Sequence, residues 1–162
     1  MSKKKATLRI PLTENQLNDR QYWTIYYQHF NWNTLIWSDE TTICNDSNCY
    51  QKIWYQEDEK IIKCKYKYPI KINLWGAIVK NKGLIFKIFD EKMNSGEYIK
   101  TLKEKLLPLI KNNRDYIYQQ DNAPYHVSYK LSSFFSKNKI ELMYWPSNSP
   151  DINPIENIWN LI

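Results

Sequence analysis

The order of secondary-structure signals from Leu35 onward constrains the fold more than any other feature of this 162-residue chain. Three runs rich in β-forming apolar residues come first. Amphipathic helical stretches then alternate with two further short apolar runs. This alternation predicts an α/β fold, a mixed five-stranded sheet flanked by helices, because each amphipathic stripe must bury its apolar face against a neighbouring layer.

The expected strands are β-rich or apolar runs bounded by polar or turn-forming residues. They cover Leu35–Ser38, Lys71–Val79, Leu84–Phe89, Tyr116–Gln120 and Ile140–Tyr144. A polar connection containing Gly83 separates the second from the third, which predicts a hairpin. The segment Asn45–Asn48 should form a turn after the first strand.

The expected helices have capping signals or apolar residues at helical spacing. Thr13–Phe30 should be helical, because Thr13 and Gln16 match a capping box, and Asn94–Glu97 resembles another cap. Two apolar stripes follow, one formed by Ile99, Leu102, Leu106, Leu109 and Ile110, the next by Val127, Leu131, Phe134 and Phe135. Pro108 should mark the last turn or a kink of the first of these two helices.

Length and composition are those of one soluble domain with a substantial core, since 43% of the residues are hydrophobic. No apolar run is long enough to span a bilayer, and the lysine-rich start leads into no signal-peptide region, so we expect an intracellular protein without a membrane partner. Three cysteines with no close pair support neither a disulfide framework nor a zinc site.

The formal net charge of +6 fits a polyanionic partner, although it does not distinguish DNA from RNA, and part of it reflects AT-rich codon bias. Lys63, Lys65 and Lys67 alternate with Cys and Tyr residues, which places the three lysines on one face of an extended segment. That face could contact a DNA backbone. It could equally be a solvated edge strand on which lysines discourage aggregation.

Three carboxylates stand at the edges of expected elements. Asp39 lies in W-S-D-E, Asp121 lies in Q-Q-D-N-A-P-Y-H, and Glu156 lies in W-P-S-N-S-P-D-I-N-P-I-E-N-I-W. A folded sheet could gather them, and carboxylates brought together stay ionised by binding hard cations or by pairing with bases. No basic residue flanks any of the three in the sequence, so we expect a metal site.

Each carboxylate also has a simpler interpretation. Asp39 could merely end a strand, and Asp121 could begin a turn, although the abrupt break after it favours a functional position. Glu156 could close a capping box with Asn153 as N-cap and Pro154 at the first helical position. Asp151 competes with Glu156 as the third acidic group.

The neighbours of these carboxylates have more modest expected roles. Glu40 should point to the face opposite Asp39. His126 is a candidate auxiliary catalytic residue, but a helix-start or hydrogen-bonding role is favoured. Trp145 and Trp159 are most simply core or loop-anchoring aromatics.

The three acidic segments resemble the catalytic core of Tc/mariner-type transposases of the DDE group. The final Glu and the 34 residues between Asp121 and Glu156 resemble the Tc branch. The resemblance implies a ribonuclease-H-like fold, with Asp39 and Asp121 on adjacent central strands. It also implies that Asp39, Asp121 and Glu156 are the catalytic residues and hold two Mg²⁺ or Mn²⁺ ions. Asp151 would belong to the loop before the final helix.

The resemblance further implies an endonuclease and strand-transferase that acts on double-stranded DNA at transposon ends and at a target. Water would cleave the phosphodiester, and the freed 3′ hydroxyl would then attack the target. A homodimer is a candidate state, and the location would be nuclear in a eukaryote and otherwise cytoplasmic.

Domain boundaries follow from the extent of the resemblance. Residues 1–31 are expected to be a basic, helical extension without helix-turn-helix modules, and 32–162 the catalytic core, for which truncation within the final helix stays open. Two other functions stay open from the sequence. One is a truncated or domesticated remnant that binds nucleic acid without cutting it, and the other is a ribonuclease-H-like nuclease acting on RNA or hybrids.

Overall fold

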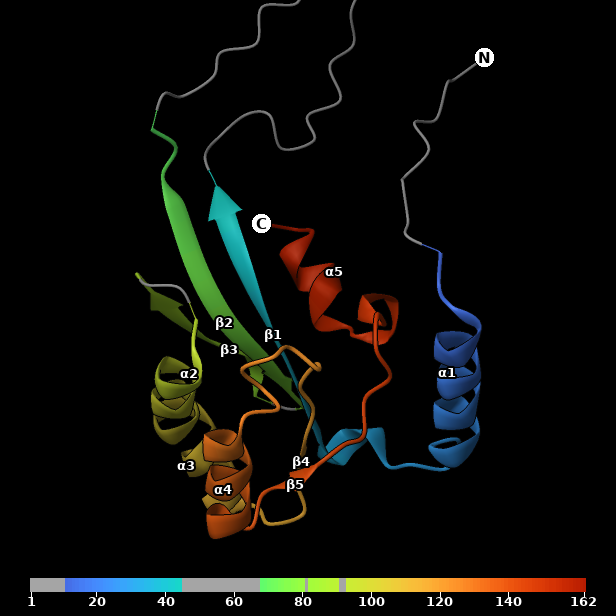
Figure 1. The fold of residues 1–162 in the computed structure, drawn as a ribbon. Helices are drawn as coiled ribbons and strands as arrows, with labels where there is room; N and C mark the ends of the chain where they lie inside the picture. Colours follow the sequence, from blue (N-terminus) through green and yellow to red (C-terminus); the bar gives the residue numbers. More distant parts are fainter. Residues whose placement is uncertain (1–10, 45–67, 81, 91–92) are drawn as a thin grey trace, which may run out of the picture.

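In a computed structural model, residues 11–44, 68–80, 82–90 and 93–162 are described, and they form a five-stranded sheet with helices on both sides (Figure 1). The strands are β1 (Leu35–Cys44), β2 (Lys71–Val79), β3 (Gly83–Phe89), β4 (Ile117–Tyr118) and β5 (Glu141–Leu142). Their order is β3-β2-β1-β4-β5, antiparallel from β3 to β1 and parallel from β1 to β5. The predicted mixed five-stranded sheet is confirmed.

The helices enclose this sheet from two sides. They are α1 (Glu14–Tyr26), α2 (Ser95–Thr101), α3 (Leu107–Asn112), α4 (Tyr129–Asn138) and α5 (Ile155–Trp159). Figure 1 shows α2, α3 and α4 on one side, with α1 and α5 on the other. Among the described residues, no helix combines the length and apolar character needed to cross a bilayer.

The β2–β3 hairpin forms where the sequence predicts it. Val79 pairs with Gly83 across the turn, and Lys82 donates its backbone N–H to the Val79 carbonyl at 3.1 Å. Gly83 has φ +74°, a conformation that glycine adopts without the steric cost of a Cβ atom.

Pro108 lies early in α3 rather than in the last turn of one long helix. The preceding residues Leu102–Leu106 form a π-helical segment, in which the Leu107 N–H donates to the Leu102 carbonyl. Proline lacks the N–H that would continue the regular ladder, and its ring crowds the carbonyl four residues back. The widened turn before Pro108 therefore accommodates the proline without ending the helical run.

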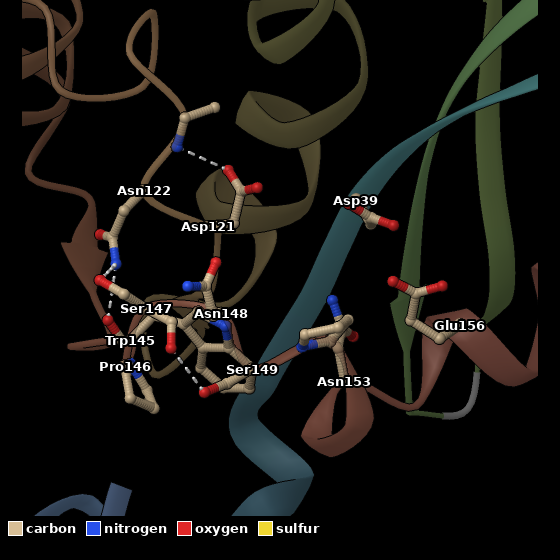
Figure 2. Close-up of a pocket in the computed structure, with 12 residues that line it drawn as sticks. Asp39, Asp121, Asn122, Trp145, Pro146, Ser147, Asn148, Ser149, Asn153 and Glu156 are labelled. Atoms are coloured by element: carbon tan, nitrogen blue, oxygen red, sulfur yellow. Dashed lines mark hydrogen bonds between the residues drawn. The ribbon is translucent and has the colours of Figure 1, made fainter. Parts of the chain in front are cut away.

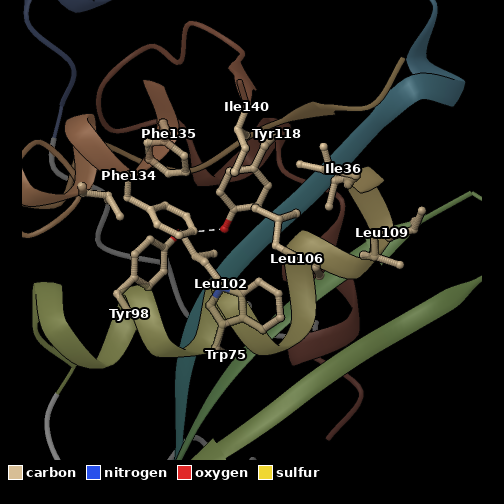
Figure 3. Packing of buried hydrophobic residues seen from close by; sticks show 14 of the residues in the cluster. Ile36, Trp75, Tyr98, Leu102, Leu106, Leu109, Tyr118, Phe134, Phe135 and Ile140 are labelled. Carbon is tan, nitrogen blue, oxygen red and sulfur yellow. Dashed lines mark hydrogen bonds between the residues drawn. The ribbon is translucent and has the colours of Figure 1, made fainter. Parts of the chain in front are cut away.

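The main core lies between the sheet and the α2–α4 layer (Figure 3). Helical residues Tyr98, Leu102, Leu106 and Leu131 are fully buried there, against sheet residues that include Trp75. Alternate β1 residues face this core, so the residues between them, including Asp39, face the opposite side. The core thus fixes which β1 side chains can reach the α5 side of the sheet.

A smaller aromatic cluster joins α1 to the opposite face. It contains Trp23, Leu35, Met143 and Trp145, and the Trp23 indole N–H donates to the Tyr144 carbonyl at 2.8 Å. The predicted capping box forms at the start of α1, with Gln16 N–H donating to Thr13 Oγ1 at 3.3 Å and Thr13 N–H donating to Gln16 Oε1 at 3.0 Å.

Some expected boundaries are wrong. The helix predicted to begin near Val127 starts at Tyr129, and Val127 is exposed. The strand predicted to stop at Ser38 continues to Cys44, because the chain pairs with β2 along its whole length. The predicted turn Asn45–Asn48 lies outside the described residues.

Candidate active site

Three carboxylates from different elements line one pocket of about 450 Å³ (Figure 2). Asp39 comes from β1, Asp121 follows β4, and Glu156 stands in the first turn of α5. Asp39 does not end its strand as expected, but lies within β1 directly opposite Gly76 of β2. The structure therefore brings all three predicted site residues to one cavity.

Parallel pairing of β1 with β4 sets Asp121 beside β1. Beyond the last paired strand residue, Gln119 N–H donates to the Ile36 carbonyl at 2.9 Å, and the Gln119 side-chain oxygen accepts from Ser38 N–H at 3.0 Å. The Ser38 hydroxyl adds a bond to the Gln119 carbonyl at 2.8 Å. These bonds fix the chain two residues before Asp121 and one residue before Asp39.

The loop before α5 closes the pocket and is tied to both neighbouring segments. Asn122 donates its side-chain amide to the Trp145 carbonyl at 2.9 Å, and Asn153 donates to the Ser38 carbonyl at 3.1 Å. Asn148 has φ 52°, which asparagine tolerates better than most residues. The loop that precedes Glu156 is thereby attached to β1 and to the segment that carries Asp121.

The capping box that would have explained Glu156 does not form. Asn153 Oδ1 accepts from Ile155 N–H at 3.3 Å, as an N-cap would, but Asn153 N–H donates to the Pro150 carbonyl rather than to Glu156. Glu156 instead lines the pocket with its carboxylate facing that of Asp39 (Figure 2). Asp151, the competing acid, forms a bidentate pair with Arg20 at 2.8 and 2.6 Å.

Asp39 and Glu156 form the electronegative side of the pocket. Burial, followed by repulsion from Glu40 and Glu156, raises the pKa of Asp39 to about 7. Burial also raises the pKa of Glu156. In the described part of the chain, no Lys or Arg forms a salt bridge with either carboxylate. A cation on this side would relieve their mutual repulsion.

Asp121 has a different environment, because the structure supplies the base that the sequence did not place beside it. His126 Nδ1 lies 2.6 Å from Asp121 Oδ1, and Ala123 N–H donates to the same oxygen at 2.9 Å. Burial favours the neutral acid, yet these two bonds hold the pKa of Asp121 below its ordinary value. Asp121 is therefore an ionised acceptor with one oxygen already engaged.

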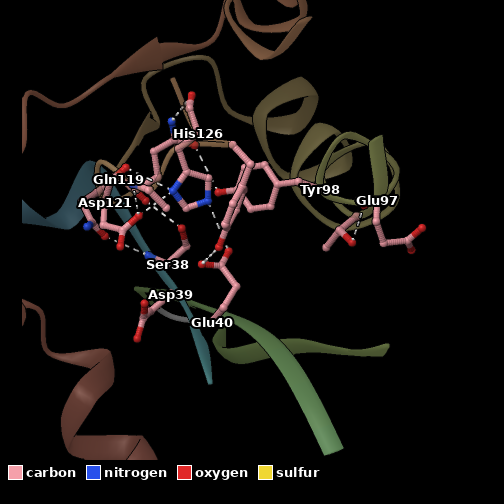
Figure 4. A network of polar contacts seen from close by, with 12 residues as sticks. Ser38, Asp39, Glu40, Glu97, Tyr98, Gln119, Asp121 and His126 are labelled. Atoms are coloured by element: carbon pink, nitrogen blue, oxygen red, sulfur yellow. Dashed lines mark hydrogen bonds and ion pairs between the residues drawn. The ribbon is translucent and has the colours of Figure 1, made fainter. Parts of the chain in front are cut away.

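His126 sits between two carboxylates on the buried side of the site (Figure 4). Its Nε2 lies 3.6 Å from Glu40 Oε1, an ion-pair distance rather than a hydrogen bond. Burial disfavours the charged ring, but Asp121 and Glu40 together raise the pKa of His126 to about 9. The His126 imidazole is buried behind Asp121 and hydrogen-bonds to its carboxylate, which is the type of contact that the sequence favoured.

Glu40 points away from Asp39, as the strand alternation predicts. Its carboxylate accepts from the Tyr125 hydroxyl at 3.2 Å, near a buried chain of hydroxyl groups (Figure 4). In that chain the Ser38 and Tyr118 hydroxyls are 2.7 Å apart, as are the Tyr118 and Tyr98 hydroxyls. This polar layer braces the strand that carries Asp39.

Trp159 is the site residue that sequence reasoning missed. Its indole N–H donates to Asp39 Oδ2 at 3.0 Å, whereas Trp145 is a buried core residue as expected. The available signal was Gly76, a glycine inside an otherwise apolar strand, which often marks the close approach of another group.

Within the described ranges, no three His, Cys, Asp or Glu side chains stand close enough together to hold one metal ion. The pocket therefore contains hard oxygen donors, but they are not placed around a single position that an ion could occupy. Lys63, Lys65 and Lys67, the predicted backbone contacts, lie outside the described residues.

Comparison with known proteins identifies what the chain resembles. A family model described as DDE superfamily endonuclease matches residues 34–162. The Tc3 transposase of Caenorhabditis elegans is 31% identical over 137 residues, which are 82% of this chain and 42% of that protein. The Tc1 transposase of the same organism is 28% identical over 139 residues, 79% of this chain and 50% of that protein. The chain therefore spans about half the length of these relatives.

Solved structures share the fold at low sequence identity. A Mos1 transposase paired-end complex with the left transposon end matches with a TM-score of 0.77 and 17% identity, over 99% of this chain and 52% of that chain. Mos1 paired-end complexes with Mn and with Mg match with TM-scores of 0.73 and 0.75, at 17% and 16% identity, each over 99% of this chain and 54% of the other. The expected ribonuclease-H-like fold is confirmed, and the chain belongs to the DDE superfamily of endonucleases as a catalytic domain of the Tc1/mariner transposase type.

Proposed function

We propose that the chain is the metal-dependent endonuclease and strand-transfer core of a cut-and-paste DNA transposase, with Asp39, Asp121 and Glu156 as its catalytic and metal-binding residues. The observation that carries the proposal is their joint presence in one pocket of a DDE-family domain. DNA is the proposed substrate because related complexes contain a transposon end, and the net charge of +6 favours a polyanion.

The donor chemistry of the pocket fits a divalent cation. Carboxylate oxygens are the ligands that Mg²⁺ and Mn²⁺ prefer, and Asp39 and Glu156 have no cationic side-chain partner among the described residues. The Mos1 complexes solved with Mg and with Mn support the same choice. We propose two ions, which when bound would supply an activated water and stabilise the leaving oxygen of a phosphodiester.

The residues of the chain have separate tasks in this proposal. Asp39 and Glu156 would provide the unpaired negative charge that attracts a cation. Asp121 would present the oxygen that His126 does not engage, and His126 would keep that carboxylate ionised and oriented. Because the three acids do not converge as they stand, binding would have to draw their side chains together.

The first test is nicking of supercoiled plasmid with Mg²⁺ or Mn²⁺, with EDTA as the metal-free control. Asp121→Asn should lose nicking, whereas Asp115→Asn, which makes the same change at an exposed position, should retain it. Salt-sensitive DNA binding without nicking would instead identify a nucleic-acid-binding remnant. Preferential cleavage of an RNA–DNA hybrid would identify a ribonuclease.

Wider features of the protein are proposals as well. A homodimer would allow two transposon ends to be held together, and light scattering with end DNA would test that state. Nuclear localisation in a eukaryotic host would follow from the DNA substrate.

A further inference from the structure

Trp159 lies where it can control the orientation of Asp39. Its indole nitrogen donates to one oxygen of the Asp39 carboxylate, Oδ2, at 3.0 Å across a separation of 120 residues in the chain. The Asp39 side chain has two rotatable bonds, and the backbone N–H of Glu40 also interacts with its carboxylate. The indole is the directional side-chain donor that limits how the carboxylate can turn beside this backbone contact.

Gly76 provides the space that Trp159 needs. Gly76 is the residue directly opposite Asp39 in the β1–β2 pair, so any side chain there would share the Asp39 face. A Cβ atom built on Gly76 would lie 2.4 Å from Trp159 Cη2 and 2.9 Å from Cζ2. Both are ring atoms of a partly buried indole, so only glycine lets the ring lie over the strand at this depth.

The helix α5 couples this contact to the third carboxylate. Glu156 and Trp159 are three residues apart, so they are neighbours on one helix face, and both face Asp39. Ile155, one turn before Trp159, is fully buried and holds the same helix against Gly76. One short helix thus presents both a candidate ligand and a donor to a second candidate ligand.

We propose that Trp159 is a positioning residue for metal binding, whose indole N–H, seated over Gly76, fixes the Asp39 carboxylate in the orientation that receives a divalent cation. The inference rests on the proposed function of the pocket. Hydrogen bonds to ligating side chains orient the ligand before the ion arrives, and their loss typically weakens metal affinity or activity about 10- to 100-fold.

Mn²⁺ binding measured by electron paramagnetic resonance of the free ion, without DNA, tests the role directly. Trp159→Phe keeps an aromatic ring and removes the donor, so it should weaken Mn²⁺ binding about 10-fold. Trp23→Phe on α1 is the matched control, because it removes an indole bond of 2.8 Å to the Tyr144 carbonyl, and it should leave Mn²⁺ affinity unchanged. Gly76→Ala leaves Trp159 in the chain but displaces its indole from Asp39, so it should weaken Mn²⁺ binding as Trp159→Phe does.

The outcomes separate the inference from the proposed function. Equal Mn²⁺ affinity in the unaltered protein and in folded Trp159→Phe overturns the positioning role. Absence of Mn²⁺ binding by the unaltered protein contradicts the metal site itself.

If Trp159→Phe does not fold, a second measurement on the unaltered protein tests the positioning role of Trp159. The nuclear magnetic resonance signal of the Trp159 indole N–H, assigned through its contacts with neighbouring residues, should shift as Mg²⁺ saturates the site. A signal that stays in place while Mg²⁺ binds overturns the inference.

Discussion

Replacing Asp39 with Asn should stabilise the metal-free protein at alkaline pH. The native state raises the Asp39 pKa from 3.8 to about 7, so it binds a proton more tightly than the unfolded chain does. Between these two pH values, stability falls as pH rises, because the unfolded state holds fewer protons than the native state. Above pH 7 the full cost of the buried charge is present, and Asn removes it.

The magnitude follows from the size of the shift. A shift of about 3 pKa units at about 1.4 kcal/mol per unit gives an upper bound of about 4 kcal/mol. Solvent that reaches the open pocket reduces this value, so we expect a gain of about 2 kcal/mol in the free energy of unfolding at pH 8. For a chain of this size, that corresponds to a rise in Tm of about 4 to 8 °C.

Thermal unfolding in EDTA at pH 5 and pH 8 is the assay, with Asp115→Asn as the exposed-carboxylate control. The advantage of Asp39→Asn should be larger at pH 8 than at pH 5, where the native acid is already protonated. Added Mg²⁺ should raise the Tm of the unaltered protein but not that of Asp39→Asn. An Asn variant that is less stable than the unaltered protein at pH 8, or a gain equal at both pH values, would refute the reasoning.

Three further predictions test the surroundings of the pocket. His126→Gln should lower the free energy of unfolding by about 2 kcal/mol below pH 6.5 and by less as pH rises through 9. The raised pKa of His126 means that its charged form stabilises the native state at low pH, and this stabilisation is lost as the ring deprotonates. Urea unfolding at pH 6 and 9.5 measures the difference. Asn153→Ala should cost about 2 kcal/mol in urea unfolding, since it removes the buried bond to the Ser38 carbonyl and the bond from Ile155 N–H. A double-mutant cycle of Arg20→Ala and Asp151→Ala should give a coupling of about 1 kcal/mol that weakens in high salt, because both groups are partly exposed.

The elements of the fold were predictable where local pattern and tertiary packing agree. The β2–β3 hairpin, the capped start of α1 and the apolar stripe from Ile99 to Ile110 all follow from residue spacing. The full length of β1 was not predictable from its apolar run, because its second half is polar and is held as a strand by pairing with β2. The π-helical turn before Pro108 likewise depends on how the helix packs rather than on propensity.

The gathering of the three predicted carboxylates in one pocket was predictable from the sequence, but their electrostatics were not. The sequence separates His126 from Asp121 by only four residues, yet the bond between them depends on the turn 123–126 that folds the imidazole back. Trp159 and Asp39 are 120 residues apart, and only the pairing of Asp39 with Gly76 brings the indole within reach. Contacts of this range require the sheet register, which a single sequence does not supply.

Asp39 and Asp121 have the same expected role, but their surroundings shift their pKa values in opposite directions. His126 and a backbone N–H already compensate Asp121, so its ionised form is favoured without a metal. Asp39 faces Glu156 and lies near Glu40, with the Trp159 indole as its side-chain donor, so its ionised form is disfavoured in the absence of a cation. The pocket is therefore asymmetric: its affinity for a cation should depend most on the Asp39 and Glu156 side, and its resting geometry most on the Asp121 side. This division would let one pocket keep three acids together in the absence of metal and still receive the proposed cation.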